Sequence, residues 1–214
     1  METETQSMKT KNEMITFSGN FSDYFVSIVD IVESTKVTAK LPAKQACKYY
    51  AIFLNAMAAI VEDFGGRIVK NIGDSLLYYF PKKIGFSEKI LCKYSLECAI
   101  AMLDSGKKIN ELLSQEKLPT VKYRISGDYG TVIIARDNHS SLDDVFGPPV
   151  NICAKINRYA FPNSIVIGGD MYQIAKSLPE YYFKPCANYS NGLKFSYPVY
   201  SIGRKNLDEI VNFE

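Results

Sequence analysis

The chain has 214 residues, enough for one domain with a sizeable core. Its apolar fraction of 47% and charged fraction of 22% are ordinary for a globular protein. A formal net charge of +2, with the lysines scattered along the chain, excludes a nucleic-acid partner held by bulk positive charge.

The N-terminus and the cysteines indicate the compartment. No run of about 18 apolar residues is present to span a membrane, and METETQSMKTKNEM lacks the apolar core of a signal peptide. We therefore expect a cytoplasmic protein without a membrane partner. The five cysteines have no CxxC spacing, which favours reduced thiols, and the single histidine, His139, lies in a polar run where no zinc site is expected.

Strand and helix signals alternate in the first half of the chain. The apolar run Tyr24 to Ile31 predicts a central strand that is buried on both faces and carries Asp30 near its end. Helical spacing of apolar residues predicts a helix over 42–64, which Gly65-Gly66 ends. Two short strands, 67–70 and 75–80, flank the hairpin signal Asn71-Ile72-Gly73-Asp74.

The second half continues with longer elements. The pattern of apolar residues predicts helices over 87–113, 148–160 and 170–176. It predicts strands over 121–134, 164–167 and 195–202. We expect one domain over residues 21–204, between a flexible N-terminal segment, 1–20, and a C-terminal tail, 205–214.

The order strand, helix, hairpin, helix, strand predicts an α/β (α+β) fold with a ferredoxin-like βαββαβ core. That topology places the first and third strands side by side and antiparallel. Asp30 ends the first strand and Asp74 immediately precedes the third, so the two carboxylates are expected to meet.

Paired carboxylates at one sheet edge are costly unless a positive charge lies between them. Mg²⁺ binds one or two carboxylates together with phosphate oxygens, and two ions about 4 Å apart can activate an attacking oxygen. The turn at Ser34 and Thr35 would offer backbone N–H groups to phosphates. The alternative is purely structural: Asp30 is a helix cap and Asp74 a turn former.

Four segments carry a family resemblance. VDIVEST, VKNIGDSLLYYF, RISGDYGTVI and DVFGPPVNICAKIN, in this order, resemble the catalytic domain of class III adenylate and guanylate cyclases, and the resemblance runs from about Tyr24 to Tyr200. It implies that Asp30 and Asp74 bind two Mg²⁺ or Mn²⁺ ions, with the carbonyl of Ile31 as a further ligand.

The resemblance also implies a purine-reading pair, Lys70 and Asp144. A lysine can donate to ring N1 of adenine and a carboxylate can accept from its 6-amino group, whereas guanine has the opposite pattern. The alternative for these two residues is an ordinary surface ion pair.

Further implied positions lie on the third long helix and near the last strand. Asn151 matches the residue that orients the ribose, and Lys155 stands four residues on, where the family usually has an arginine that stabilises the transferring phosphate. Lys194 is the nearest candidate for a triphosphate-binding lysine. One departure is judged structural: Asp128, where the family commonly has histidine. Gly168-Gly169-Asp170 is similar to the signature of diguanylate cyclases, but the residues that follow do not continue it, so we expect a turn before a short helix.

The function implied is a lyase that converts ATP to 3′,5′-cyclic AMP and pyrophosphate for signal transduction. In this family the metal aspartates and the purine-reading residues come from opposite protomers, so a homodimer with two shared sites is expected. Two alternatives stay open. The chain is a cyclase-homology domain that binds nucleotide or a partner without turnover, which Lys155 favours, or it acts on another nucleoside triphosphate or polyphosphate.

Overall fold

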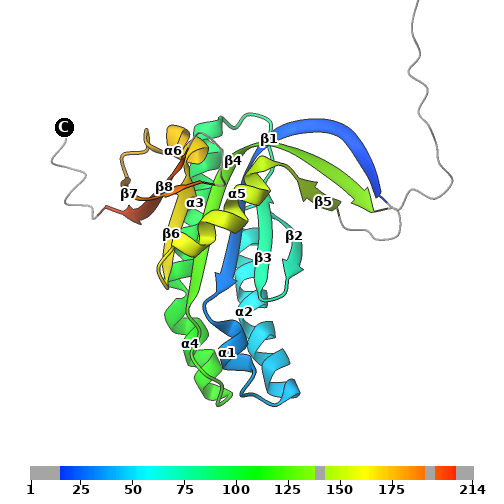
Figure 1. Cartoon of the computed structure of the whole chain (residues 1–214), viewed down its shortest axis with the longest axis vertical. Coiled ribbons are helices and arrows are strands. Elements are labelled where there is room, and N and C mark those ends of the chain that lie inside the picture. The colour runs from blue at the N-terminus through cyan, green and yellow to red at the C-terminus, as the bar shows by residue number, and fades with distance from the viewer. Residues whose placement is uncertain (1–14, 138–142, 191–195, 206–214) are drawn as a thin grey trace, which may run out of the picture.

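A mixed sheet of eight strands forms the centre of the computed structural model (Figure 1), which describes residues 15–137, 143–190 and 196–205. Its order is β2-β3-β1-β4-β6-β8-β7, and β5 pairs with the far part of β4. Neighbouring strands are antiparallel except β4 and β6, which are parallel. The strands are β1 Ile15–Ile31, β2 Arg67–Ile72, β3 Ser75–Phe80, β4 Tyr123–Asp137, β5 Asp143–Phe146, β6 Ser164–Gly168, β7 Tyr181–Tyr189 and β8 Tyr197–Arg204.

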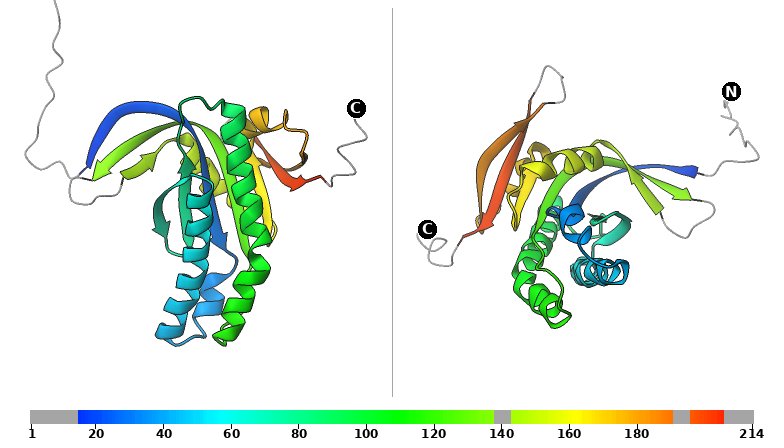
Figure 2. Two further views of the ribbon diagram at one scale, coloured as in Figure 1. Left: turned by 180° about the vertical axis from the view of Figure 1, so that it is seen from behind. Right: turned by 60° about the horizontal axis from the view of Figure 1, so that its bottom comes forward.

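Helices cover both faces of this sheet. Helices α2, α3 and α4 pack on one face and α5 lies across the other (Figure 2). The helices are α1 Ser34–Thr38, α2 Ala43–Asp63, α3 Glu88–Asp104, α4 Gly106–Gln115, α5 Pro148–Ile156 and α6 Gly169–Ala175, with a 3₁₀ turn at Asn157–Tyr159.

The burial of β1 on both faces follows from these two helical layers. Phe25 and Val29 belong to the larger core, under α2, α3 and α4. Val26 and Ile28 belong to a smaller core that includes Cys153 of α5. Because successive side chains of a strand point to opposite faces, a strand covered on both sides must be apolar throughout.

The predicted ferredoxin-like core is confirmed. Its four strands have the order β2-β3-β1-β4, and β1 and β3 are adjacent and antiparallel. In this register Asp30 is paired with Ser75, the residue that follows Asp74. The turn between β2 and β3 therefore lies at the same end of the sheet as the end of β1.

The strand β1 is longer than predicted and begins inside the segment expected to be a flexible lead-in. Residues 15–17 pair with 137–135 of β4, and a register shift separates them from the pairing that starts at Phe21. Together the two strands form an arm that curves away from the body of the molecule (Figure 2). This pairing moves the start of the folded domain back from residue 21 to Ile15.

The predicted helix over 87–113 is two helices. α3 ends at Asp104 and α4 begins at Gly106. At the break, Ser105 Oγ and Tyr123 Oη both donate to the carbonyl of Met102. Gly106 fits here because a Cβ would lie 2.9 Å from Tyr123 Oη.

Candidate active site at the end of strand β1

Asp30 has both carboxylate oxygens engaged by neighbouring strands. Ser75 Oγ donates to Oδ1 at 2.6 Å and Arg124 Nη2 donates to Oδ2 at 3.1 Å. Both contacts follow from the sheet, since Ser75 and Arg124 are the register partners of Asp30 on β3 and β4. The Asp30 and Arg124 side chains are 21% and 24% exposed, so solvent screens this pair only in part.

Asp74 lies in the tight turn between β2 and β3. Gly73 has a φ of 63°, which glycine adopts without strain, and this lets the chain reverse just before Asp74. Burial raises the pKa of the nearby Tyr49 hydroxyl to about 12, and the charge of Asp74 adds to that shift. The structure thus brings Asp30 and Asp74 to one end of the sheet, as predicted.

The donors at this end suit a hard divalent cation. Two carboxylates and the carbonyls of the β1 end are all oxygen donors, the kind that Mg²⁺ and Mn²⁺ prefer. Within the described parts of the chain, no group of three or more His, Cys, Asp and Glu side chains could hold a metal ion. Two carboxylates alone fit an ion whose other ligands come from substrate and water, not a closed structural site.

A small cavity opens beside Asp30. It has a volume of about 180 Å³, and its lining is Ile28, Asp30, Ile72, Ser75, Ala154 and Asn157. Asn157 is buried, and its amide donates to Ser126 Oγ at 3.2 Å. Pockets for drug-sized ligands measure about 300–1,000 Å³, so this cavity cannot enclose a nucleoside triphosphate by itself.

Lys70 and Asp144 form an ion pair. Lys70 Nζ lies 2.5 Å from Asp144 Oδ2, and the two side chains are 45% and 32% exposed. They come from β2 and β5, which are distant in sequence, and Asp144 Oδ1 also accepts the N–H of Val145 at 2.8 Å. The structure thus brings the two residues together as a partly exposed ion pair, the alternative that the sequence left open for them, and their role in reading a purine stays a prediction.

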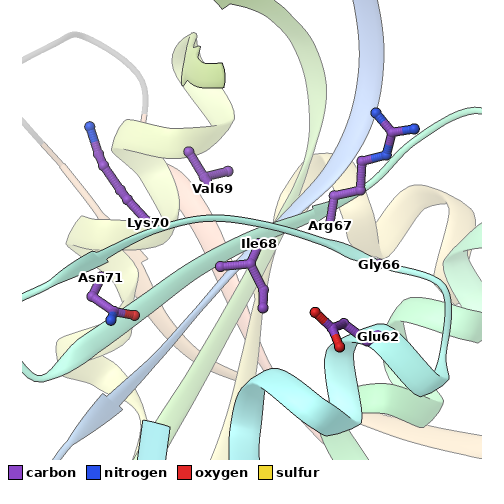
Figure 3. A pocket seen from close by; sticks show the side chains of 7 residues that line it. All are labelled: Glu62, Gly66, Arg67, Ile68, Val69, Lys70 and Asn71. Carbon is purple, nitrogen blue, oxygen red and sulfur yellow. The ribbon is translucent and has the colours of Figure 1, made fainter. Parts of the chain in front are cut away.

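A larger hollow of about 560 Å³ borders Lys70, between the end of α2 and β2, and is lined by Glu62 and residues 66–71. Figure 3 shows Ile68 on the same side of β2 as Glu62, whereas Lys70 projects to the opposite side. The Lys70 side chain therefore lies on the face of the sheet that α5 covers, and not on the α2 side of the hollow.

Asn151 and Lys155 lie on α5, and both are exposed. Pro148 and Pro149 begin that helix, as predicted, directly after Gly147. Lys155 Nζ is 5.5 Å from the centre of the Tyr189 ring, a cation–π contact that orients the side chain. Arg158, beyond the end of α5, instead donates to Tyr159 Oη and is exposed.

The segment after Asp30 turns into the short helix α1. Ser34 is buried and its carbonyl accepts the Thr38 hydroxyl at 2.9 Å, whereas Thr35 is exposed. Glu33, before them, has a φ of 56°, a strained value for a residue with a side chain. Ile31 is buried, so only its backbone is available for a ligand.

Sequence reasoning missed three residues at this end of the sheet: Ser75, Arg124 and Asn157. Arg124 opens the quoted segment RISGDYGTVI, and only the register of β1 and β4 shows that it faces Asp30. Its Nε is buried and has no hydrogen-bond partner among the residues that the structure describes. Lys194, the candidate triphosphate-binding lysine, lies outside the described residues.

Asp128 is a buried carboxylate farther along β4. Tyr197 Oη contacts both of its oxygens, at 2.9 and 3.0 Å, and the N–H of Met171 lies 3.4 Å from Oδ1. Burial raises the pKa of Asp128 to about 7, although the hydrogen bonds from Tyr197 and Met171 favour the ionised carboxylate and act to lower it. This carboxylate joins β4 to α6 and β8, and Gly168-Gly169-Asp170 forms the predicted turn before α6.

The βαββαβ sheet, with two carboxylates at the end of its central strand, is compatible with a catalytic domain that acts on nucleotides. The family model for the adenylate and guanylate cyclase catalytic domain matches residues 19–191. The chain belongs to this family. A comparison with curated protein sequences gave no match.

Solved structures share the fold at low sequence identity. The guanylyl cyclase Cya2 is 18% identical, with a TM-score of 0.76 over 88% of this chain and 95% of its own. The adenylyl cyclase CyaB from P. aeruginosa is 17% identical, with a TM-score of 0.76 over 88% and 98%. The guanylate cyclase domain of RhGC from Catenaria anguillulae, in complex with GTP, is 16% identical, with a TM-score of 0.74 over 88% and 100%.

Proposed function

We propose that the protein is an adenylate cyclase that converts ATP to 3′,5′-cyclic AMP and pyrophosphate. The observation that carries this proposal is the location of Asp30 and Asp74 at one end of the sheet, where β1 and β3 are in register. Membership of the family supports a cyclase. The choice of ATP rests on Lys70 and Asp144 alone, because the similar structures include both adenylyl and guanylyl cyclases.

Asp30 and Asp74 would hold two Mg²⁺ or Mn²⁺ ions, with the Ile31 carbonyl as a further ligand. Bound there, the ions would lower the pKa of the ribose 3′-hydroxyl and neutralise charge on the triphosphate. Ser75 fixes one oxygen of Asp30 by its hydrogen bond, so this carboxylate is oriented before any ligand arrives.

Three groups of this chain would act on the triphosphate. The guanidinium of Arg124 has N–H donors beyond its contact with Asp30, including the unpartnered Nε, which suit phosphate oxygens. The backbone N–H groups of Ser34 and Thr35 would donate to phosphate oxygens of the same triphosphate. Lys194 would contact the terminal phosphates.

On α5, Asn151 would orient the ribose and Lys155 would stabilise charge on the transferring phosphate. Their spacing of four residues puts both side chains on one face of the helix. A lysine keeps the positive charge that the family's arginine supplies, without its planar two-pronged hydrogen bonding.

Lys70 and Asp144 would read the adenine. In the structure they are bonded to each other, so adenine N1 and the 6-amino group would replace that bond with one hydrogen bond to each. Guanine would present an N–H to Lys70, so that a donor faces a donor, and a carbonyl to Asp144, so that an acceptor faces an acceptor.

A homodimer with two shared sites is the assembly we propose. Its support is the small size of the cavity at Asp30 together with the exposure of Lys70, Asp144, Asn151 and Lys155 on one protomer. A second protomer would cover these side chains and complete the site. The RhoGC guanylyl cyclase domain from Blastocladiella emersonii is described both as an unusual dimer and as a monomer, so the fold alone does not fix the assembly.

The first test is product formation by the purified protein with Mn²⁺ and either ATP or GTP. We expect cyclic AMP from ATP, little cyclic GMP from GTP, and loss of both in the Asp74→Ala variant. Cyclic GMP as the main product would contradict the adenine assignment. Metal-dependent ATP binding without any cyclic product would favour the second candidate function, a domain that binds nucleotide without turnover, for which Lys155 is the specific observation.

A further inference from the structure

An apolar surface cluster lies at the start of α3, away from the candidate active site. Ten large apolar side chains are exposed among the described residues, and four of them fall within residues 84–94. They are Ile84, Phe86, Ile90 and Tyr94, which we call the apolar tip. Ile84 is fully exposed, and the rings of Phe86 and Tyr94 lie 5.8 Å apart.

The apolar tip is a protrusion. The loop between β3 and α3 lies at the end of the molecule from which the β1–β4 arm curves outward (Figure 2). Ile90 and Tyr94 are four residues apart on α3, so they share one helix face next to this loop. Phe21, also exposed, precedes Asp23, whose carboxylate lies 4.0 Å from Lys82 of the loop.

Two lysines, Lys83 and Lys89, lie in the same segment as the apolar tip. Lys83 Nζ is 5.9 Å from the centre of the Phe86 ring, and Lys89 Nζ donates to the carbonyl of Ser177 at 3.0 Å. Neither ammonium has a carboxylate partner in the described structure. Lys176, next to Ser177, bonds only the neutral Gln173.

The nearby acids are already engaged. Asp23 accepts the Thr131 hydroxyl at 2.5 Å and faces Lys82, and Glu180 pairs with Lys93 at 2.5 Å. Burial, with a smaller contribution from the nearby Glu88 carboxylate, raises the pKa of the Tyr129 hydroxyl. Residues 81–94 carry four lysines, Lys82, Lys83, Lys89 and Lys93, and one acid, Glu88. Even with Asp23 facing Lys82 and Glu180 facing Lys93, the segment that carries the apolar tip keeps a positive charge.

We infer that the apolar tip and its lysines form a contact surface for an anionic phospholipid bilayer. Exposed apolar side chains with lysines in the same segment fit the boundary between headgroups and acyl chains, where apolar side chains enter and ammonium groups stay with anionic headgroups. The charge complementarity decides for anionic over neutral lipid.

Such contact is peripheral. No helix within the described residues is long and apolar enough to cross a membrane, and contact through one loop and one helix face needs none. The sequence-based expectation of no membrane partner rested on the absence of a spanning segment. Surface attachment does not conflict with that absence, and it is independent of the proposed cyclase activity.

Flotation of the full chain with vesicles tests the inference directly. The vesicles contain phosphatidylcholine alone, or phosphatidylcholine mixed with phosphatidylserine. We expect binding to the mixed vesicles that falls with rising salt, and at least about tenfold weaker binding after Ile84→Ser with Phe86→Ser, or after Lys83→Glu with Lys89→Glu. The matched controls are Phe161→Ser and Lys107→Glu, exposed positions elsewhere, which should bind like the unchanged protein.

A second readout uses the absence of tryptophan from the sequence. Ile84→Trp introduces a single indole at the apolar tip, and its emission should shift to the blue with mixed vesicles, whereas Phe161→Trp should not shift. Because both positions are exposed, neither change should affect folding. The inference would be overturned if the protein floated with neither vesicle, bound both equally, or showed no shift in the Ile84→Trp emission. The apolar tip would then be a candidate contact surface for a protein partner.

Discussion

The carboxylate of Asp30 is held from two sides before any ligand binds. Ser75 is neutral and can keep its hydrogen bond when a cation arrives, whereas Arg124 carries a charge that a cation would oppose. A divalent ion at Asp30 would therefore push the Arg124 guanidinium toward the nearest anion, the triphosphate of a bound nucleotide. Metal and nucleotide binding should reinforce each other through this one arginine.

Lys155→Arg should raise turnover. Arginine would restore two-pronged hydrogen bonding to the transferring phosphate, and a donor at such a position is worth roughly 10²–10³ in rate in comparable sites. We expect kcat to rise about tenfold or more with little change in KM, measured as cyclic AMP formed from ATP with Mn²⁺. The contact with Tyr189 does not oppose the exchange, since arginine also stacks on aromatic rings.

The control for this change is Arg158→Lys, an exposed exchange on the following turn, which should leave kcat unchanged. A rise in kcat with Arg158→Lys, or none with Lys155→Arg, would show that Lys155 does not act on the phosphate.

Asp128 should make the free energy of unfolding depend on pH. Its pKa is raised from 3.8 to about 7 in the folded chain, so between these values the folded state binds more protons than the unfolded state. Stability must then fall as pH rises from about 4 to about 7 and level off above that. The full difference is on the order of 4 kcal/mol, since each pKa unit corresponds to about 1.4 kcal/mol.

Asp128→Asn removes that titration. The amide keeps a neutral hydrogen-bonding group next to Tyr197, so we expect the variant to lose less stability than the unchanged protein between pH 5 and pH 8. Urea unfolding at both pH values measures the difference. The control is Asp63→Asn, an exposed carboxylate at the end of α2. A pH dependence that survives Asp128→Asn would contradict the assignment.

At the level of elements, the start of α5 is fixed by one glycine. Gly147 has a φ of 154°, and a Cβ there would lie 2.6 Å from the carbonyl oxygen of Thr131 on β4. The chain needs this close approach to pass from β5 into α5. The positions of Asn151 and Lys155 on that helix therefore depend on a residue that has no side chain.

Gly147→Ala should destabilise the domain. The Cβ meets backbone that cannot rotate away, at a cost of about 3 kcal/mol, which corresponds to a fall in Tm of about 6–12 °C for a chain of this size. Gly85→Ala is the matched control, since Gly85 also has a positive φ of 82° but open space around it. Calorimetry should show a much smaller fall for Gly85→Ala, and equal falls would rule out the clash with Thr131.

Elements with strong periodicity were predictable. The strand β3 was predicted with its observed bounds, and α2 within one residue at each end, because apolar spacing and turn residues agree there. β5 and β7 were missed, since β5 has four residues and most positions of β7 are exposed without a regular alternation of buried and exposed residues. The break at Ser105 depends on Tyr123, a distant contact that no local pattern contains.

The same limit applies to the candidate site. Asp30 and Asp74 could be placed together because one topology rule fixes the neighbours of β1. Arg124 and Ser75 face Asp30 through the register between strands, which the order of elements leaves open. Asn157, directly after α5, lines the cavity because of how α5 packs on the sheet. That packing cannot be predicted from a single sequence.

At the level of the whole molecule, one protomer carries its candidate functional groups without enclosing a substrate. The cavity at Asp30 is about 180 Å³, and the Lys70–Asp144 pair lies on a different part of the same open face. A second copy in a symmetric dimer would face this surface with its own matching surface. Each site would then combine the metal carboxylates of one protomer with the purine-reading pair of the other.

Mixing two inactive variants tests this arrangement. Asp74→Ala and Lys70→Ala should each be inactive alone, whether as monomer or homodimer. If subunits exchange at random after mixing in equal amounts, half of the dimers are mixed, and one of their two sites carries neither change. Cyclic AMP formation should therefore recover to about a quarter of the unchanged protein's rate. If instead each protomer supplied a complete site, every site in the mixture would carry one change, and the mixture would stay as inactive as its two components.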